Sequence, residues 1–103
     1  AYSASKHGVL GLIKTYSEEY MGGPITFNAI CPGYVDTPIV DANVQSMVSK
    51  GISEEDAHKM MVNANRHKRL IQTDEVAQTA LWLCSQAAKS INGQAIEIAG
   101  GKV

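Results

Sequence analysis

The stretch ITFNAICPGY, residues 25–34, gives the clearest indication of how this chain folds. Its first six residues, 25–30, form a short run that is rich in strand-forming side chains. Because Pro32 has no backbone N–H to donate into a central ladder, we expect a strand over 25–30 that ends before it. Residues 31–34 are therefore predicted to form a loop at the carboxyl end of a strand.

The segment before this strand has the periodicity of a helix, predicted over about residues 3–20. Apolar side chains recur there at helical spacing, at Val9, Leu12, Ile13, Tyr16 and Tyr20. An adjacent face carries small residues, namely Ala4, Gly8, Gly11 and Thr15. Glycine inside a helix costs about 1 kcal/mol relative to alanine, so we expect another segment to pack closely against this face.

Three helices and a second strand are predicted after the loop. The helices begin near Pro38, Ser53 and Thr73, and the strand covers 95–98 after an Asn-Gly turn. Met60 and Met61 are expected on the apolar side of the second of these helices, and Cys84 on that of the third. Two strands joined through helices make a parallel crossover, so the fold class is α/β. Two parallel strands alone would leave an open edge and uncovered apolar surface.

Composition narrows the classes of partner. The chain has 103 residues, 45% hydrophobic and 18% charged, as in one soluble globular domain. A net charge of −1 provides no field to attract nucleic acid or an anionic membrane. No apolar run reaches the roughly 18 residues of a membrane span, and no signal peptide is recognised, so a cytoplasmic location is expected. Cys31 and Cys84 match neither a redox pair nor a zinc site, so we expect both to be reduced and buried, and no metal to be bound.

Tyr2 and Lys6 are the first candidates for chemistry. They lie four residues apart and therefore share one face of the predicted helix. A neighbouring positive charge favours the phenolate form of a tyrosine, which suits proton transfer near neutral pH. The alternative is an ordinary surface contact, because a Tyr and a Lys at this spacing are common by chance.

Three motifs give this pair a context. YSASK, residues 2–6, resembles the YxxxK motif of the short-chain dehydrogenase/reductase family. NAICPGYVDTP, residues 28–38, resembles the N-x-[IV]-x-P-G-x-[IV]-x-T segment of that family, and residues 92–101 are similar to its closing strand. The resemblance implies the carboxyl-terminal portion of a Rossmann-like doubly wound parallel sheet. Residues 1–103 would then be part of a single NAD(P)-binding domain, with 39–72 as a helical flap over the substrate.

The resemblance also implies roles for individual residues. Tyr2 would be the acid/base that exchanges a proton with the substrate oxygen, and Lys6 would hold the nicotinamide ribose and support the phenolate. Pro32, Gly33 and Val35 would line the nicotinamide of NAD or NADP, with the Thr37 hydroxyl near its carboxamide or the pyrophosphate. Tyr34 would face the substrate, or else be a half-exposed packing residue.

The implied reaction interconverts a secondary alcohol and a ketone. 3-Hydroxybutyrate and 3-hydroxyacyl or 3-oxoacyl thioesters are the substrates of the most similar members. The family also forms homodimers and homotetramers, through surfaces that the small-residue helix and the final strand resemble. The family's glycine-rich phosphate loop and catalytic serine precede its tyrosine and have no counterpart here. The alternative is therefore a catalytically incompetent fragment or an assembly module.

Two segments of the sequence each allow two interpretations. The helices over 39–72 are predicted to be a movable flap or else ordinary surface helices. The basic cluster at 66–69, RHKR, is expected to be a solvated helix end, or else a contact for the phosphates of an acyl-carrier or coenzyme A thioester.

Overall fold

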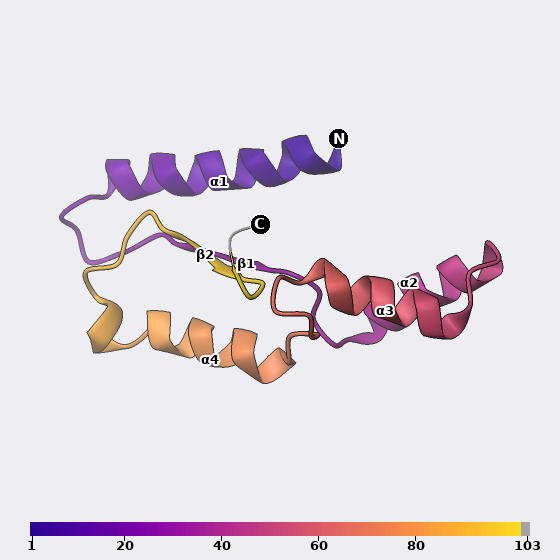
Figure 1. The fold of residues 1–103 in the computed structure, drawn as a ribbon. Coiled ribbons are helices and arrows are strands. Elements are labelled where there is room, and N and C mark those ends of the chain that lie inside the picture. The colour runs from indigo at the N-terminus through magenta and orange to yellow at the C-terminus, as the bar shows by residue number, and fades with distance from the viewer. Residues whose placement is uncertain (102–103) are drawn as a thin grey trace. The chain divides into compact units, whose positions relative to one another are not determined.

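The computed structural model describes residues 1–101. The elements follow in the order α1 (Tyr2–Glu19), β1 (Ala29–Pro32), α2 (Pro38–Ser49), α3 (Glu54–Ala64), α4 (Thr73–Leu83), the 3-10 turn η1 (Gln86–Ala88) and β2 (Ala95–Ile98) (Figure 1). This is the predicted order of helices and strands. No helix in the described part of the chain is long and apolar enough to cross a membrane.

The two strands pair in parallel. The N–H of Ala29 donates to the carbonyl of Gln94 at 2.8 Å, and the N–H of Gly33 donates to the carbonyl of Ile98 at 2.9 Å. Both partners advance by four residues in the same direction, which is the pattern of a parallel pair. The prediction of an α/β fold built on a parallel crossover is confirmed.

The position of the first strand differs from the prediction. β1 covers Ala29–Pro32 instead of 25–30, and the loop begins at Gly33 instead of Cys31. Side-chain amides bind the backbone just before β1: the N–H of Phe27 donates to Oδ1 of Asn92 at 2.9 Å. β1 ends at Pro32, which does not interrupt the pairing of the two strands. The N–H groups of residues 29 and 33 face β2. Because successive residues of a strand face opposite sides, position 32 faces away from β2 and needs no N–H.

The chain divides into two compact units, which are described separately. The first contains residues 1–30 and 79–96, and its packing centres on the carboxyl half of α1. The rings of Tyr16 and Tyr20 each lie 5.6 Å from that of Phe27. Nδ2 of Asn92 donates to the carbonyl of the buried Ser17 at 3.0 Å. The bond from Asn92 joins α1 to a residue 75 positions later in the chain.

Gly93 lies at the bend against which α1 packs. Its φ is +75°, a conformation that glycine adopts without penalty, and a Cβ there would lie 2.7 Å from Oγ of Ser17. Nζ of Lys14 donates to the carbonyl of Gly93 at 3.0 Å. The chain bends at Gly93, where the Asn-Gly turn was predicted, and the glycine is needed both for its conformation and for space.

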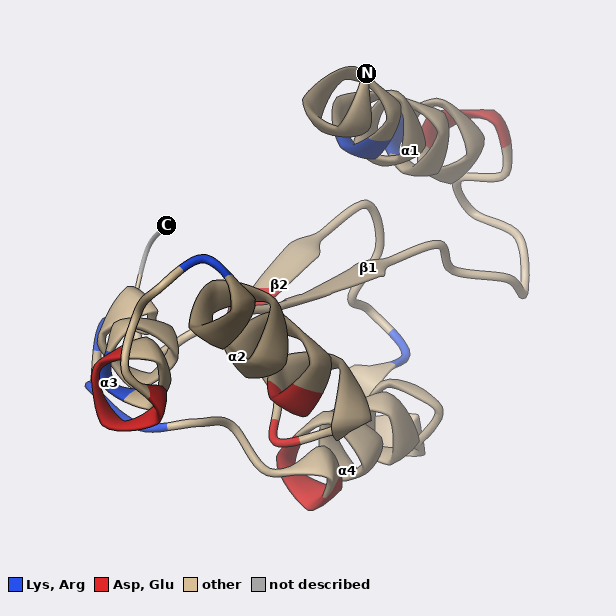
Figure 2. Ribbon diagram, turned by 90° about the vertical axis from the view of Figure 1, so that its right-hand side faces the viewer, with Lys and Arg blue, Asp and Glu red and all other residues tan. Residues whose placement is uncertain are grey.

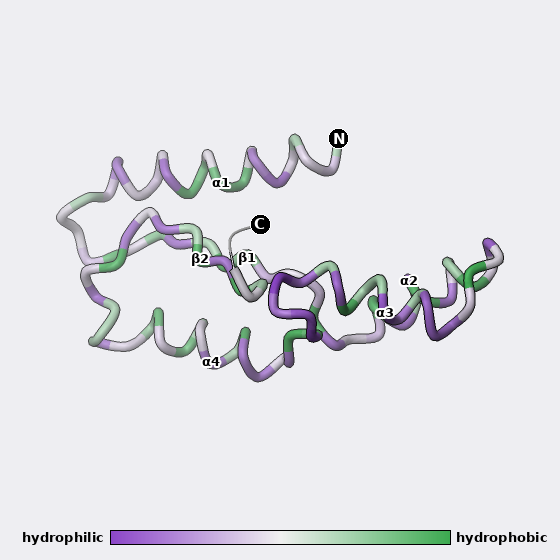
Figure 3. The backbone as a smooth tube through the Cα atoms, viewed as in Figure 1, coloured by the Kyte–Doolittle hydropathy of each residue, from purple (hydrophilic) through white to green (hydrophobic). Residues whose placement is uncertain are grey.

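Much of the expected apolar stripe of α1 is exposed. Val9 and Leu12 retain 53% and 55% of their accessible surface, although they belong to the hydrophobic middle of the helix (Figure 3). Apart from the chain neighbours and the backbone of α1 itself, no atom in the described residues lies within 4 Å of a Cβ built at Gly8 or Gly11. Residues 1–101 therefore supply no close neighbour from another segment at these two glycines, and the close packing expected on this face stays a prediction.

The second unit contains residues 31–78 and the described residues from 97 on. Its core is the α2–α3 pair, where Val40 and Val44 of α2 pack with Ala57 and Met61 of α3. Gly51, at φ +95°, ends α2 as predicted. Acidic residues gather in the first turn of α3 (Figure 2), where they complement the helix dipole.

Two side chains predicted on the apolar side of a helix are exposed. Met60 is 53% exposed, whereas Met61 is 3% exposed. Met61 lies one turn after the buried Ala57, so successive residues of the helix place Met60 on a different face. Cys84 follows the last residue of α4 and is exposed, and Cys31 is half-buried. Both cysteines are free, as expected, but the prediction of burial was wrong for Cys84.

Candidate active site

Tyr2 and Lys6 occupy the first turns of α1. Nζ of Lys6 lies 5.2 Å from the centroid of the Tyr2 ring, over the face of the ring. This is the arrangement expected of residues at i and i+4, and it is a cation–π contact. The Tyr2 side chain is 76% exposed, so its hydroxyl is open to a molecule that approaches α1.

The loop after β1 carries the other predicted site residues and is held by Ile71. The N–H of Ile71 donates to the carbonyl of Tyr34 at 3.0 Å, and the N–H of Asp36 donates to the carbonyl of Ile71 at 2.7 Å. Val35 and Ile71 therefore form a parallel bridge. Ile71 is fully buried, which anchors the bridge in the unit.

Asn65, which follows α3, holds the same loop and was not singled out by sequence reasoning. Its Oδ1 accepts a hydrogen bond from the N–H of Tyr34 at 2.9 Å. Its Nδ2 donates to the carbonyls of Tyr34 at 2.9 Å and Arg69 at 2.8 Å. The residue is 1% exposed, so these bonds satisfy an amide that burial would otherwise penalise.

Gly33 leaves room for this amide. A Cβ at position 33 would overlap Oδ1 of Asn65 and would lie 3.1 Å from Cβ of Ala99. A glycine is therefore required here by the packing of the loop itself, in addition to any role toward a ligand.

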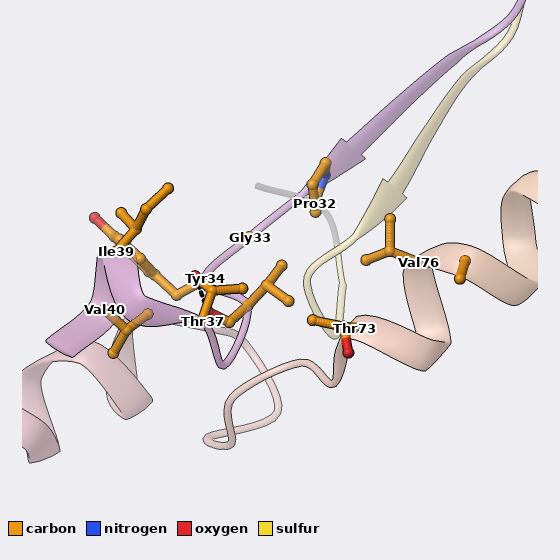
Figure 4. Close-up of a pocket in the computed structure, with 10 residues that line it drawn as sticks. Pro32, Gly33, Tyr34, Thr37, Ile39, Val40, Thr73 and Val76 are labelled. Atoms are coloured by element: carbon orange, nitrogen blue, oxygen red, sulfur yellow. Dashed lines mark hydrogen bonds between the residues drawn. The ribbon is translucent and has the colours of Figure 1, made fainter.

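An open pocket of about 460 Å³ lies beside the loop (Figure 4). The carboxyl end of β1, the first turn of α2 and the start of α4 contribute its lining, which is mostly apolar. It is lined by Pro32, Gly33, Tyr34, Val35, Thr37, Ile39, Val40, Thr73, Val76 and Ala77. The structure thus brings together all five residues predicted for the loop. Tyr2 and Lys6 belong to the other unit.

Thr37 contributes a side chain with a hydroxyl to the lining of the pocket. Its Oγ1 donates to the carbonyl of Val35 at 3.3 Å, a long bond that leaves the oxygen available as an acceptor (Figure 4). Tyr34 is 42% exposed, which is compatible with either of its two interpretations.

An ion pair fixes the start of α4. The guanidinium of Arg69 donates two hydrogen bonds of 2.8 Å to the carboxylate of Glu75, which also accepts one of 2.7 Å from the N–H of Gln72. The hydrogen bonds from Arg69, followed by that from Gln72, lower the pKa of Glu75 from 4.5 to about 2. One cation of the basic cluster is thus engaged within the fold.

The rest of the basic cluster is tied in part to its surroundings. Nζ of Lys68 donates to the carbonyl of Asn63 at 3.1 Å, near the carboxyl end of α3, which agrees with the expectation of a helix end. The backbone N–H of Arg66 donates to the carbonyl of Ala99 at 2.9 Å. A contact with thioester phosphates stays a prediction.

Comparison with known proteins identifies the family. The family model described as enoyl-(acyl carrier protein) reductase matches residues 1–102. The chain belongs to the short-chain dehydrogenase/reductase family. Among curated members, D-beta-hydroxybutyrate dehydrogenase of Rhizobium meliloti (strain 1021) is 38% identical over 103 residues, 98% of this chain and 40% of the relative. Granaticin polyketide synthase putative ketoacyl reductase 1 of Streptomyces violaceoruber is 37% identical over 101 residues, 97% of this chain and 37% of the relative.

Solved structures of this family agree with the fold. A variant of actinorhodin polyketide ketoreductase crystallised with NADPH has a TM-score of 0.85 and 35% identity, with 97% of this chain and 39% of that chain covered. Levodione reductase has a TM-score of 0.84 and 32% identity, covering 97% and 38%. This short-chain dehydrogenase/reductase chain thus spans about 40% of the length of the relatives it matches. The predicted Rossmann-like class is confirmed for that portion.

Proposed function

We propose that the whole protein containing this chain is an NAD(P)-dependent oxidoreductase that interconverts a secondary alcohol and a ketone. The observation that carries the proposal is the exposed Tyr2 ring with the Lys6 ammonium 5.2 Å from its centroid. Family membership supports it, since a related ketoreductase was crystallised with NADPH and other relatives are named as dehydrogenases and reductases.

Tyr2 is assigned the proton transfer. Its phenol gives a proton to the substrate oxygen during ketone reduction and takes one back during alcohol oxidation. The charge of Lys6 stabilises the phenolate that forms when the proton leaves, and its N–H groups bind the nicotinamide ribose. The exposure of Tyr2 leaves its hydroxyl accessible to the substrate.

The pocket beside β1 fits a nicotinamide. Its volume of about 460 Å³ falls within the range of small-molecule sites, and its walls are mostly apolar. It lies beyond the carboxyl end of a parallel strand, where open α/β sheets bind ligands. Pro32, Gly33 and Val35 line the ring in our assignment, and the Thr37 oxygen binds near the carboxamide or the pyrophosphate. A bound nicotinamide would supply the hydride in ketone reduction and accept it in alcohol oxidation.

The substrate and the assembly are part of the same proposal. We assign a 3-hydroxybutyrate or a 3-hydroxyacyl or 3-oxoacyl substrate, consistent with the names of the relatives. Tyr34 faces it, and residues 39–72, with α2 and α3, form its flap. The enzyme is a homodimer or homotetramer, for which the exposed apolar side chains of α1 provide surface.

A Tyr2→Phe variant of the whole protein tests this proposal. The variant keeps the ring that contacts Lys6 and removes only the hydroxyl, so turnover should fall by a factor of about 10²–10⁴ while nucleotide binding is retained. Tyr16→Phe is the matched control in the same helix, because the Tyr16 ring stacks on Phe27 and the substitution preserves that contact. Full activity of Tyr2→Phe would rule out the acid/base role.

The alternative is that this chain by itself is a catalytically incompetent fragment or an assembly module. Its coverage of about 40% of the relatives favours this for the 103-residue chain in isolation. Fluorescence titration of that chain with NADH and with NADPH separates the two possibilities. Weak, non-saturating binding is expected of a fragment, whereas saturable binding at micromolar concentration would contradict it.

A further inference from the structure

We propose that Asn65 is a positioning residue for the nicotinamide loop, holding residues 33–36 in the conformation that receives the cofactor ring. This inference rests on the proposed function of that loop. Asn65 lies directly after α3, within the segment proposed as the substrate flap. It acts by holding the loop and does not itself touch the cofactor.

The hydrogen bonds of Asn65 are directed at a single loop residue. Its amide binds both the N–H and the carbonyl of Tyr34, each at 2.9 Å. The second N–H of this amide donates to the carbonyl of Arg69 at 2.8 Å, which fixes the orientation of the side chain. With 1% exposure the amide has almost no access to water, so a movement of the loop would break bonds that solvent does not replace.

Gly33 and Ile71 complete the arrangement. The absence of a Cβ at Gly33 lets Oδ1 of Asn65 approach the loop backbone. Ile71 donates to the same carbonyl of Tyr34 that Nδ2 of Asn65 reaches, so that carbonyl accepts two hydrogen bonds. Tyr34 is therefore held by two segments that follow α3, and its neighbours Gly33 and Val35 line the pocket on either side of it.

An affinity comparison in the whole protein tests this role. Dissociation constants of NADH and ADP-ribose are measured for wild type and Asn65→Ala, or of NADPH and 2'-phospho-ADP-ribose if the enzyme uses NADP. We expect Asn65→Ala to weaken the intact dinucleotide by about tenfold or more and ADP-ribose by less than about twofold, because only the former presents a ring to the loop. Gln78→Ala is the control: removal of an exposed side-chain amide on α4, outside the flap and the pocket lining, should change neither constant.

The two hypotheses fail in different ways. If the wild-type protein binds neither nucleotide, the proposed function is wrong. If the wild type binds both, and Asn65→Ala leaves their ratio of affinities unchanged, the positioning role is wrong.

A variant of the same size, which leaves no cavity, keeps the test decisive if Asn65→Ala does not fold. Asn65→Asp retains the acceptor for the N–H of Tyr34 and loses both donors as a carboxylate, but regains one donor when protonated. Burial raises the pKa of a carboxyl group at this position, so the donor returns as the pH falls. The defect in dinucleotide affinity should therefore shrink between pH 8 and pH 5, relative to the wild-type profile. A defect that is independent of pH over this range would overturn the role of the donors.

Discussion

The side-chain amide of Asn65 pairs with both polar backbone groups of Tyr34, a residue 31 positions earlier in the chain. The amide provides one acceptor and one donor to the same residue, as the edge of a neighbouring strand would. The loop after β1 is thus held without a further strand at this point. Its shape depends on the buried Asn65 amide together with the backbone of Ile71, so substitutions nearby should affect it.

Replacement of Gly33 by alanine should destabilise the chain. The new Cβ would overlap Oδ1 of Asn65 and crowd Ala99, so the free energy of unfolding should fall by about 1–3 kcal/mol. Urea denaturation followed by circular dichroism measures the change. Gly8→Ala is the matched control, because its Cβ meets no atom within 4 Å and alanine stabilises a helix interior by about 1 kcal/mol. Equal stability of the two variants would contradict the overlap.

The adjacent methionines of α3 should differ sharply in their contribution. Met61→Ala removes a side chain packed in the α2–α3 core and should cost about 2–5 kcal/mol of unfolding free energy. Met60→Ala changes a side chain that is 53% exposed and should cost less than about 0.5 kcal/mol. Similar losses for both, measured by thermal or urea unfolding, would mean that the helix faces are assigned wrongly.

The Arg69–Glu75 pair should make stability depend on pH in the acid range. The folded pKa of Glu75 is about 2, below its ordinary 4.5, so the unfolded state binds more protons between these values. The contribution is therefore present above about pH 4.5 and is lost as the pH falls toward 2. The difference in unfolding midpoint between wild type and Glu75→Gln should be largest at neutral pH and should shrink over this window.

A second acidic residue serves as the control for that measurement. Glu55 forms an exposed ion pair of 3.2 Å with Lys59 one helical turn away. Exposed pairs of this kind contribute little, so Glu55→Gln should change the midpoint much less at neutral pH. A midpoint difference for Glu75→Gln that stays constant from pH 7 to pH 2 would be inconsistent with the lowered pKa.

The exposed face of α1 should make the isolated chain associate. Val9 and Leu12 present apolar side chains, and Gly8 and Gly11 leave room for a close approach. Sedimentation of the isolated 103-residue chain should show concentration-dependent association, which a Leu12→Lys substitution reduces. A purely monomeric chain at high micromolar concentration would argue against this surface as an interface.

Local signals in the sequence were sufficient for most of the fold. The N-cap Ser53 accepts from the N–H of Asp56 as its position predicts, Pro38 begins α2, and Lys6 meets Tyr2 because helical spacing requires it. Each of these features depends on residues within a few positions of one another. The pattern of residue types therefore carries the information.

Features that depend on distant partners were not predictable in the same way. The first strand was placed too early because residues 25–27 are strand formers by composition. In the structure the N–H of Phe27 donates to the side chain of Asn92, and the side chain of Asn28 accepts from the N–H of Gln94. Asn65 has no local mark that separates it from the exposed Asn63, and its partner Tyr34 becomes visible only in the folded chain. The five loop residues were found through the family motif, whereas the residues that hold the loop required the structure.

The bond between Ser17 and Asn92 has a consequence for synthesis on the ribosome. The two residues are 75 positions apart, so α1 emerges from the ribosome long before the turn that binds it exists. At about 5–20 residues per second, roughly 4–15 seconds pass between their additions to the chain. During this interval the apolar side chains of α1 are available to bind chaperones or another nascent chain.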